Sequence, residues 1–332
     1  MTAIRNPPPA SPDFKINILA ALIAVGIGTV LMRYWLDVRI YNQGESAYQQ
    51  GNCNAAVPQF QKLAQAQRLH DFNDYQARSR SRLDECEAFL ATTDATSSPP
   101  DQLLAYEAFN DRYDESPLIA VVQDQAADLV TATDAATLAV RPVCDRVEPL
   151  GQKGLVPAEA APQLWFACGQ RYENEADYEA AIAAYEQVLR SKAAPETVTQ
   201  AETALAQVLV AQANAEGAGT ISQPGWSGYT QTDATEVFVR NDSPERMRIV
   251  FSGPEPHFEE IAPCEDCRTY SLEGPEVCPN KGPTATFTLQ PGDYEVLVRS
   301  VSDPTVSPFT GVWSLDTGEA YNSCFYLVQS PS

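Results

Sequence analysis

Histidine is the scarcest of the side chains that commonly carry catalysis or bind metals in this chain of 332 residues. There are two, His70, expected at a helix start, and His257, expected in a Pro-rich loop. The motifs GxSxG, HExxH, GxxxxGK[ST] and GxGxxG, which mark common hydrolase, metalloprotease and nucleotide sites, are absent. Adjacent carboxylates such as Glu259 and Glu260 would point to opposite faces of a strand. We therefore expect no enzyme, no bound cofactor and no metal site.

Positive charge is also scarce. The chain has 22 Lys and Arg residues against 44 Asp and Glu residues, which gives a net charge of −22. Binding to nucleic acid or to the surface of anionic lipid depends on basic patches, so this composition argues against both. An acidic surface keeps a protein soluble, and it would also attract a basic partner protein. The charge therefore predicts no nucleic-acid partner and leaves a basic protein partner open.

The chain has one long apolar run, at residues 16–36, with Tyr34 and Trp35 at its end, where interfacial aromatic residues lie in membrane proteins. Its length is close to the ~20 residues that cross a bilayer. A cleaved signal peptide is the alternative, but a small-residue cleavage site should then follow, and Arg33 to Leu36 stand there instead. We expect an uncleaved, single-pass transmembrane helix after a short tail at residues 1–15.

The orientation of this helix is not set by its flanking charges. Arg5 and Lys15 precede it, and Arg33 and Arg39 follow it. All the cysteines, however, lie after the helix, and an even number spread over a non-catalytic chain suits an oxidising compartment. They are Cys53, Cys86, Cys144, Cys168, Cys264, Cys267, Cys278 and Cys324. We expect a cytoplasmic N-terminus and exoplasmic domains, in a periplasm or a thylakoid lumen.

Residues 164–188 carry the most specific pattern of the chain. Trp165, Gly169 and Tyr172 precede a short acidic turn, and Ala181 and Tyr185 follow it. This segment resembles one helical hairpin of the tetratricopeptide-repeat (TPR) family. In that family the small residues lie where the two helices of a hairpin approach closely, and the aromatic residues fill the gaps between hairpins. The resemblance implies a stack of hairpins whose usual activity is to hold another protein.

A second, weaker copy lies at residues 41–63, with Gly44, Gly51, Ala56 and Phe60 at the equivalent places and Tyr48 shifted by one. Residues 103–130 resemble the Ser-Pro junction of divergent TPRs, and residues 70–90 and 196–214 also read as helices. We therefore expect a TPR-like helical solenoid over residues 37–215, with about eight to ten helices. Residues 131–162 fit the repeat poorly, as a long insert or an irregular hairpin would.

The TPR resemblance also implies where a partner would bind, because exposed residues of the first helix line the concave side in this family. Near Trp165 these are Gln163, Phe166 and Gln170, which helical spacing places on one face. Phe166 would be a partner anchor, or it would pack within the repeat. The whole layout is similar to membrane-anchored TPR proteins of cyanobacterial type, so we expect a non-enzymatic scaffold or assembly factor. Its partners would be proteins, including a basic protein or a membrane complex.

The cysteines in the helical part suggest two disulfides. Cys53 begins one helix and Cys86 lies late in the next, and antiparallel neighbouring helices bring such ends together. Cys144 and Cys168 are left as the second pair, and the four remaining cysteines allow three pairings.

The motif Cys264-Glu-Asp-Cys267 has three interpretations: structural disulfides, a redox centre and a zinc site. A redox pair is typically found at a helix N-terminus that lowers the thiol pKa, and here the neighbours are Pro263 and acidic residues. A zinc site of this kind would usually have a second CxxC. Structural disulfides are therefore the favoured interpretation.

Composition changes at residues 216–219, where alanine-rich helix gives way to Gly, Pro, Ser and Thr. We expect a linker at 216–233 and an antiparallel β-sandwich at 234–332, which makes the fold class α+β and multidomain. The expected strands are 235–240, 247–251, 285–289, 294–298, 310–315 and 324–328. The stretch LQPGDYEVLV is similar to a hairpin of carboxypeptidase-regulatory-like sandwiches, in which a Pro-Gly turn joins two paired strands.

The aromatic residues of this region suggest an alternative function, binding of cell-wall glycan or another polysaccharide. Trp226, Tyr229, Trp313 and Tyr321 could form a sugar-binding face. Trp313 lies in a strand-like alternation and is expected in the core. Trp226 and Tyr229 lie in the expected linker and are better candidates for an exposed contact.

Overall fold

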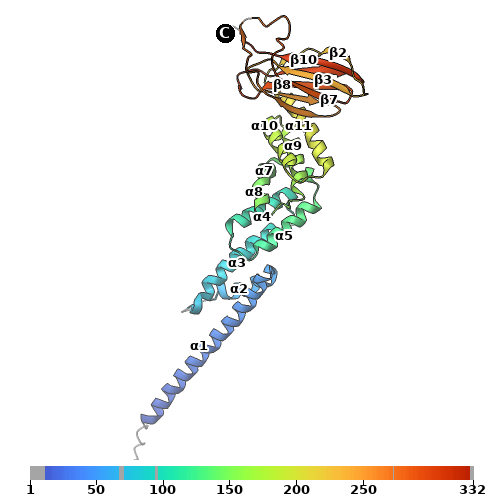
Figure 1. Ribbon diagram of the computed structural model, residues 1–332. Helices are drawn as coiled ribbons and strands as arrows, with labels where there is room; N and C mark the ends of the chain where they lie inside the picture. The colour runs from blue at the N-terminus through green and yellow to red at the C-terminus, as the bar shows by residue number, and fades with distance from the viewer. Residues whose placement is uncertain (1–11, 67–70, 94–95, 272, 330–332) are drawn as a thin grey trace, which may run out of the picture. The chain divides into compact units, whose positions relative to one another are not determined.

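The computed structural model describes residues 12–66, 71–93, 96–271 and 273–329 (Figure 1). It contains an N-terminal apolar helix, many further helices and mixed β-sheets, so the architecture is α+β. The chain divides into two compact units, one reaching residue 132 and including 152–155, the other formed by 133–151 and 156–332. His70, expected at a helix start, lies outside the described residues.

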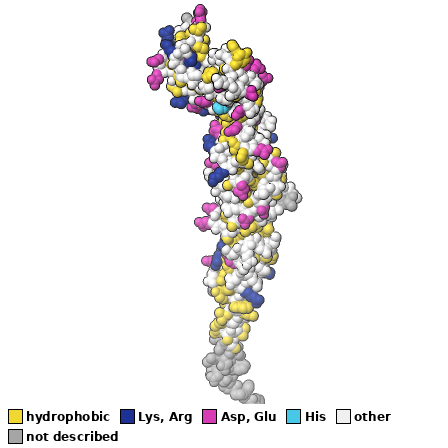
Figure 2. Space-filling model, turned by 45° about the vertical axis from the view of Figure 1, so that its right-hand side comes forward, with side chains coloured by type: hydrophobic (Ala, Val, Ile, Leu, Met, Phe, Trp, Pro, Cys, Tyr) yellow, Lys and Arg dark blue, Asp and Glu magenta, His cyan; other side chains and the backbone are white. Residues whose placement is uncertain are grey.

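The first unit begins with α1 (Pro12–Gln49), an unbroken helix of 38 residues. It contains the predicted transmembrane segment and continues into the first helix of the predicted first hairpin, so no break occurs at residue 36. Residues 21–36 are exposed, and Figure 2 shows hydrophobic side chains at the surface along this stretch. Among the described residues, this is the one helix long and apolar enough to cross a membrane, with a mean hydropathy of 1.5.

In the described part of the first unit four more α-helices follow: α2 (Cys53–Ala64), α3 (Tyr75–Thr92), α4 (Pro99–Arg112) and α5 (Ile119–Ala132). A single 3₁₀ turn, Phe72–Asp74, precedes α3. The side chain of Asn52 accepts a hydrogen bond from the Ala55 amide and starts α2, and Ser98 caps α4 in the same way through Asp101. Prolines 99 and 100 stand in the first turn of α4, where a missing N–H is tolerated.

The second unit starts with the irregular stretch. Its short helices are α6 (Ala135–Leu138), α7 (Arg141–Cys144) and α8 (Val147–Gln152), whose last residue belongs to the first unit. Three regular helices follow: α9 (Ala161–Asn174), α10 (Tyr178–Arg190) and α11 (Pro195–Ala215). α9 packs against α10, and α10 packs against α11.

Two larger sheets and one small sheet follow α11. The five-stranded sheet has the order β1-β9-β8-β4-β5, with β1 at Gly219–Thr220, β4 at Met247–Ser252, β5 at His257–Ile261, β8 at Gly292–Ser300 and β9 at Phe309–Leu315. The four-stranded sheet has the order β2-β10-β3-β7, with β2 at Gly225–Tyr229, β3 at Thr235–Asn241, β7 at Thr284–Leu289 and β10 at Glu319–Phe325. Strands β6 (Tyr270–Ser271) and β11 (Val328–Gln329) pair with each other.

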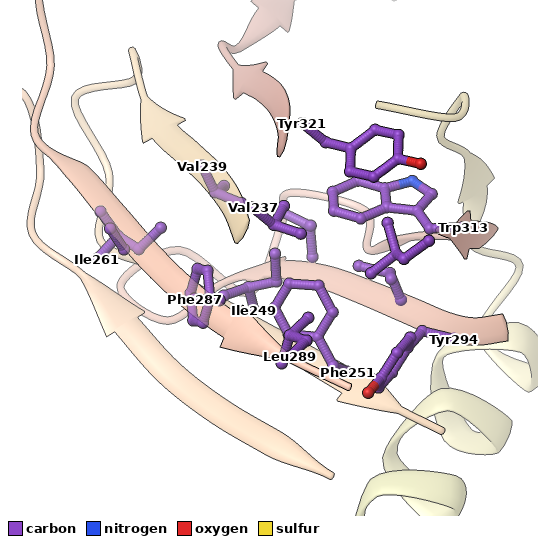
Figure 3. Packing of buried hydrophobic residues seen from close by; sticks show 14 of the residues in the cluster. Val237, Val239, Ile249, Phe251, Ile261, Phe287, Leu289, Tyr294, Trp313 and Tyr321 are labelled. Carbon is purple, nitrogen blue, oxygen red and sulfur yellow. The ribbon is translucent and has the colours of Figure 1, made fainter. Parts of the chain in front are cut away.

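One hydrophobic core joins the two larger sheets (Figure 3). Every second residue of β3 and β7 enters it from one sheet, and β4, β8 and β9 supply the other side, because side chains alternate along a strand. Trp313 lies at its centre with no exposed surface, as expected, and Phe251 contacts it at 5.8 Å between ring centroids. On the opposite face of the five-stranded sheet, α11 packs against β4, β8 and β9.

The structure corrects the expected strand pairing. The sheets are mixed rather than antiparallel, because β10 runs parallel to β3 and β1 runs parallel to β9. The turn at residues 290–293 does not close a hairpin, since β7 before it pairs with β3 while β8 after it pairs with β4 and β9. It carries the chain from one sheet to the other. The alternation of the two strands was visible in the sequence, whereas their partners were not.

Three placements in the second unit also differ from expectation. The segment expected as a linker contains β1 and β2, which pair with β9 and β10. His257 lies in strand β5 rather than in a loop. The last long strand, β10, begins at Glu319 instead of Cys324. Glycine hid β1 and β2, because this residue is typical of turns as well as of edge strands and bulges.

Candidate functional site

The α9–α10 hairpin, which carries the predicted partner surface, is closed by Gly169 and Tyr185. A Cβ atom placed on Gly169 would lie 2.4 Å from the Tyr185 ring, so the residue at 169 must be glycine for the two helices to approach this closely. Ala181 is fully buried, and Tyr172 is buried as well. Trp165 is only half-buried, although it was expected between helices. The small and aromatic residues of the pattern therefore form the hairpin contact, with Trp165 at its margin.

Two buried tyrosines of this hairpin donate hydrogen bonds through their hydroxyl groups, one within the hairpin and one to the irregular stretch at the end of α7. Tyr185 donates a hydrogen bond to Glu173 at 2.9 Å, and Tyr172 donates one to Asp145 at 2.8 Å. Burial, reinforced by the neighbouring carboxylate, raises the pKa of each phenol well above its ordinary value. Both side chains stay neutral at physiological pH and act as structural donors.

A second hairpin of the same design is formed by the C-terminal part of α1 with α2. Gly44 takes the place of Gly169, and a Cβ atom there would lie 2.8 Å from the Phe60 ring. Ala56 is fully buried, like Ala181. The two hairpins thus repeat the same close contact between a helix-one glycine and a helix-two aromatic ring.

The turns of the two hairpins also match. Gly51 has φ 74° and Ala176 has φ 57°, both in the left-handed region. In each turn this residue donates its amide to the carbonyl three residues back, and the next residue donates to the carbonyl five residues back. This is the Schellman pattern. Asn52 and Asp177 then cap the second helix through their side chains.

The three residues predicted to bind a partner all lie on α9. Gln163 and Gln170 are exposed. Phe166 is half-buried, and its ring centroid lies 5.7 Å from that of Tyr185. Phe166 therefore packs on its own hairpin with one side and leaves the other side accessible, whereas partner binding by the three residues stays a prediction.

Disulfide bonds link all eight cysteines. Cys53 is bonded to Cys86 and Cys144 to Cys168, the two pairs expected in the helical part. Cys264 is bonded to Cys267 and Cys278 to Cys324, which selects one of the three open pairings. The CxxC motif closes on itself and ties the loop after β5, while the Cys278–Cys324 bond fastens the loop before β7 to β10.

The first unit contains a buried polar cluster that sequence reasoning missed. Glu85, 8% exposed, accepts hydrogen bonds from Tyr48 and from Ser116, and Arg82 forms an ion pair with it at 3.2 Å. Burial raises the pKa of Tyr48 well above its ordinary value, and the hydrogen bond to Glu85 adds to this effect. In the sequence, the one sign of this cluster was that Tyr48 is shifted by one residue from the position that the TPR pattern gives to tyrosine.

Exposed aromatic residues occur on β2. Trp226 is 57% exposed and Tyr229 is 77% exposed, and their rings meet edge-to-face at 5.4 Å. Trp313 and Tyr321, by contrast, are buried. The four aromatic residues therefore do not form one face, and only the β2 pair is available to a ligand.

No model of a known protein family matches the chain, and no curated protein matches it. Within the ranges described above, the structure contains no group of three or more His, Cys, Asp or Glu side chains placed to hold a metal ion.

Proposed function

We propose that the protein is a non-enzymatic, membrane-anchored adaptor that binds a partner protein on the exoplasmic side. Its helices form a TPR-like solenoid, and its two larger sheets form a β-sandwich domain that ends the stack. The observation that supports this most directly is the repeated hairpin. Two segments far apart in the chain share the glycine–aromatic contact, the left-handed turn residue and the N-cap.

Anchoring is supported by the exposed apolar stretch of α1. If the protein were soluble, many large hydrophobic side chains between Leu22 and Leu36 would face water. Burial of such a stretch in lipid is strongly favourable, at roughly 25 cal/mol for each Å² of apolar surface removed from water. The disulfides all follow this helix and support an oxidising compartment, such as a periplasm or a thylakoid lumen, for the folded units.

The partner surface that we propose is the exposed side of α9. Gln163, Phe166 and Gln170 lie at successive turns of this helix, and Phe166 offers an aromatic ring with one open side. Such a ring between amide side chains is a typical anchor at a protein interface. The net charge of −22 favours a basic partner or a basic segment of a membrane complex.

Site-specific photo-crosslinking of the full chain in its native membrane tests this proposal. A photoreactive benzoylphenylalanine replaces Gln163 or Gln170, and the same residue at Ala183 on α10 serves as the control, since Ala183 is exposed on the same hairpin. We expect one partner, identified by mass spectrometry, to crosslink from both α9 positions and not from residue 183. Equal crosslinking from all three positions, or none from α9, would contradict the proposal.

A further inference from the structure

Basic side chains gather at one end of the first unit, although the chain as a whole is strongly acidic. Residues 33–80 carry six Lys and Arg against four Asp and Glu, a net charge of +2, so the rest of the chain carries −24. This segment begins where the apolar stretch of α1 ends, and Figure 2 shows dark blue side chains beside the end of that yellow stretch. The whole-chain charge argues against binding to anionic lipid, whereas this local excess favours it.

The fold returns two later helices to the end of the apolar stretch. The side chain of Asn73, just before α3, donates a hydrogen bond to the Tyr34 hydroxyl at 2.9 Å. In the first turn of α3, the side chain of Gln76 donates to the carbonyls of Ala64 and Ala66 at the end of α2. The end of α2 and the start of α3 therefore lie beside α1 where its apolar stretch ends.

From this point α3 leads away from the apolar stretch, in the same direction as α1. Arg78 lies over the Tyr41 ring at 4.5 Å, and Arg82, one turn later, lies over the Tyr48 ring at 4.4 Å. Side chains of a helix lean toward its N-terminus, which for α3 is the end beside the apolar stretch. Arg78 and Arg80 therefore lean toward the membrane that we propose around α1.

The spacing along α1 places these cations at the level of lipid headgroups. Arg39 and Tyr41 follow Leu36, the last residue of the apolar stretch, by about 4.5 Å and about 7.5 Å along the helix axis, at 1.5 Å per residue. The headgroup layer on each side of a bilayer is about 5–8 Å thick. Arg39 therefore lies within this layer, and Arg78, which contacts Tyr41, lies at its outer boundary.

The exposed basic side chains at this end form no ion pair within the described chain. They are Arg33, Arg39, Lys62, Arg78 and Arg80, named here the basic cluster. In the described part of the first unit, ion pairs are formed by Arg82 and Lys153 and by none of these five. The carboxylates of the segment are fewer, and Asp71 already accepts hydrogen bonds from two amides in the first turn of α3.

We propose that the basic cluster binds the phosphate groups of anionic phospholipids around α1 and so holds the first unit against the bilayer surface. Guanidinium and ammonium groups donate strong, charge-assisted hydrogen bonds to phosphate oxygens. The inference rests on the membrane anchoring proposed above and adds the class of lipid and the side chains that contact it. It concerns the leaflet next to Tyr34, whichever side of the membrane that leaflet faces.

A phospholipid fits the basic cluster better than an acidic protein does. Trp35 and Leu36 adjoin the cluster with 55% and 43% of their surfaces exposed, and Arg39 lies over the Trp35 ring at 5.6 Å. Aromatic and basic residues at the end of an apolar helix are typical of the membrane interface. An acidic protein would have to cover this apolar helix surface, which lipid covers once α1 is inserted.

Native mass spectrometry of the full chain in detergent micelles tests the choice of lipid. Phosphatidylglycerol or phosphatidylcholine with the same acyl chains is titrated, and the lipid-bound fraction gives an apparent Kd. Each Lys or Arg near an anionic surface contributes about fivefold to affinity, so we expect phosphatidylglycerol to bind about tenfold or more tightly. The triple variant Lys62→Gln, Arg78→Gln and Arg80→Gln should lose most of this preference.

A matched triple variant controls for the loss of net charge. Lys192→Gln, Arg268→Gln and Lys281→Gln remove the same three charges from exposed positions of the second unit. This variant should keep the lipid preference within about twofold, because none of the three belongs to the basic cluster. Thermal melts of both variants establish that the fold is retained.

Photo-crosslinking in liposomes tests the position of α3. Benzoylphenylalanine replaces Ala77 or Ala91, which are both exposed on α3 and lie on nearly the same face, about 21 Å apart along the helix. The liposomes contain phosphatidylglycerol and phosphatidylcholine in equal amounts. We expect lipid adducts from residue 77, enriched in phosphatidylglycerol, and none from residue 91.

Four results would overturn the inference. They are equal affinity for the two lipids, equal losses in the two triple variants, equal lipid adducts from residues 77 and 91, and glycerol phosphate bound as tightly as the lipid, which would indicate a site for a free anion. In native membranes, a protein adduct from residue 77 in place of lipid would make an acidic protein the occupant.

Failure of the anchor itself is distinguishable from failure of the basic cluster. Alkaline carbonate should leave the full chain in the membrane pellet if α1 spans the bilayer. Release of the chain would refute the anchoring and the inference together. Retention without lipid preference would refute the inference alone, and neither result depends on crosslinking from Gln163 and Gln170.

Discussion

The hairpin of α1 with α2 and the hairpin of α9 with α10 share the same helix contact and the same turn. They differ in how far the rest of the chain buries an aromatic residue on the first helix. In the first, Tyr41 takes the place of Phe166, and its ring lies 6.0 Å from that of Phe60, as Phe166 lies 5.7 Å from Tyr185. Tyr41 is 3% exposed, since Tyr75 of α3 stacks on it at 4.9 Å. Phe166 keeps an accessible side. The same hairpin geometry therefore places a buried core residue, Tyr41, in one hairpin and a partly exposed candidate partner anchor, Phe166, in the other.

The largest expected difference between the hairpins is at this aromatic position. Tyr41→Ala should lower the free energy of unfolding by about 3–5 kcal/mol, because a fully buried ring leaves a cavity. Phe166→Ala should cost less, about 2 kcal/mol, since part of its surface already contacts solvent and less apolar area is lost from the protein interior. Denaturant unfolding of the full chain in micelles measures both. Equal losses would show that Phe166 is a core residue and would move the partner surface elsewhere.

Removal of the disulfides should affect the two units almost equally. Cys53–Cys86 closes a separation of 33 residues and Cys144–Cys168 one of 24 residues. In the chain-entropy description each bond contributes about 3.5 kcal/mol, and the difference in loop length changes this by only ~0.3 kcal/mol. Paired Cys→Ala variants, followed by calorimetry, test this expectation. A much larger loss for Cys144–Cys168 would show that the irregular stretch depends on its bond for folding.

The glycine contacts should respond in parallel. Gly169→Leu and Gly44→Leu each force a side chain into an aromatic ring of the second helix, and overpacking costs about 1–3 kcal/mol or more. Gly169 should be the more sensitive, because its contact is closer. Gly151→Ala is the control, since a Cβ atom at this helical position meets nothing within 4 Å. Thermal melts followed by circular dichroism would refute the shared contact if either leucine variant behaved like the control.

Several of these features were predictable from the sequence, and the reason is locality. Helical hairpins, their turn and the Cys53–Cys86 pair depend on residues close together in the chain, where spacing carries the information. Strand partners depend on residues far apart, so the exchange of sheets at the 290–293 turn and the pairing of β2 with β10 were missed. The basic cluster was equally hidden, because contacts such as that of Asn73 with Tyr34 bring its helices together only in the folded unit.

The same reasoning explains why the placement of the candidate partner residues was predictable only in part. Helical spacing correctly placed Gln163 and Gln170 at the surface of α9. Spacing could not decide how much of Phe166 is covered, because that depends on the neighbouring helix. In the first hairpin, Tyr75 of α3 covers Tyr41, the residue equivalent to Phe166. The sequence alone does not show how much of a side chain a neighbouring helix will bury.

The smallest expected effect concerns the turn residue, where the two hairpins differ in chemistry but not in conformation. Ala176 adopts φ 57°, which is unfavourable for a residue with a Cβ atom, while Gly51 adopts φ 74° without this strain. Ala176→Gly should therefore raise the free energy of unfolding by about 0.5–1 kcal/mol, since the relief of strain exceeds the entropy that glycine adds to the unfolded chain.

The reciprocal change, Gly51→Ala, should lower the stability by about 1–2 kcal/mol, because the added Cβ atom is strained and would lie 2.8 Å from Val121. Denaturant titrations resolve differences of this size when the variants are measured side by side. The two changes have opposite signs only if both turns hold the same left-handed residue in solution. A loss of stability in Ala176→Gly would show that the second turn is relaxed, and that the hairpins share their helix contact but not their turn.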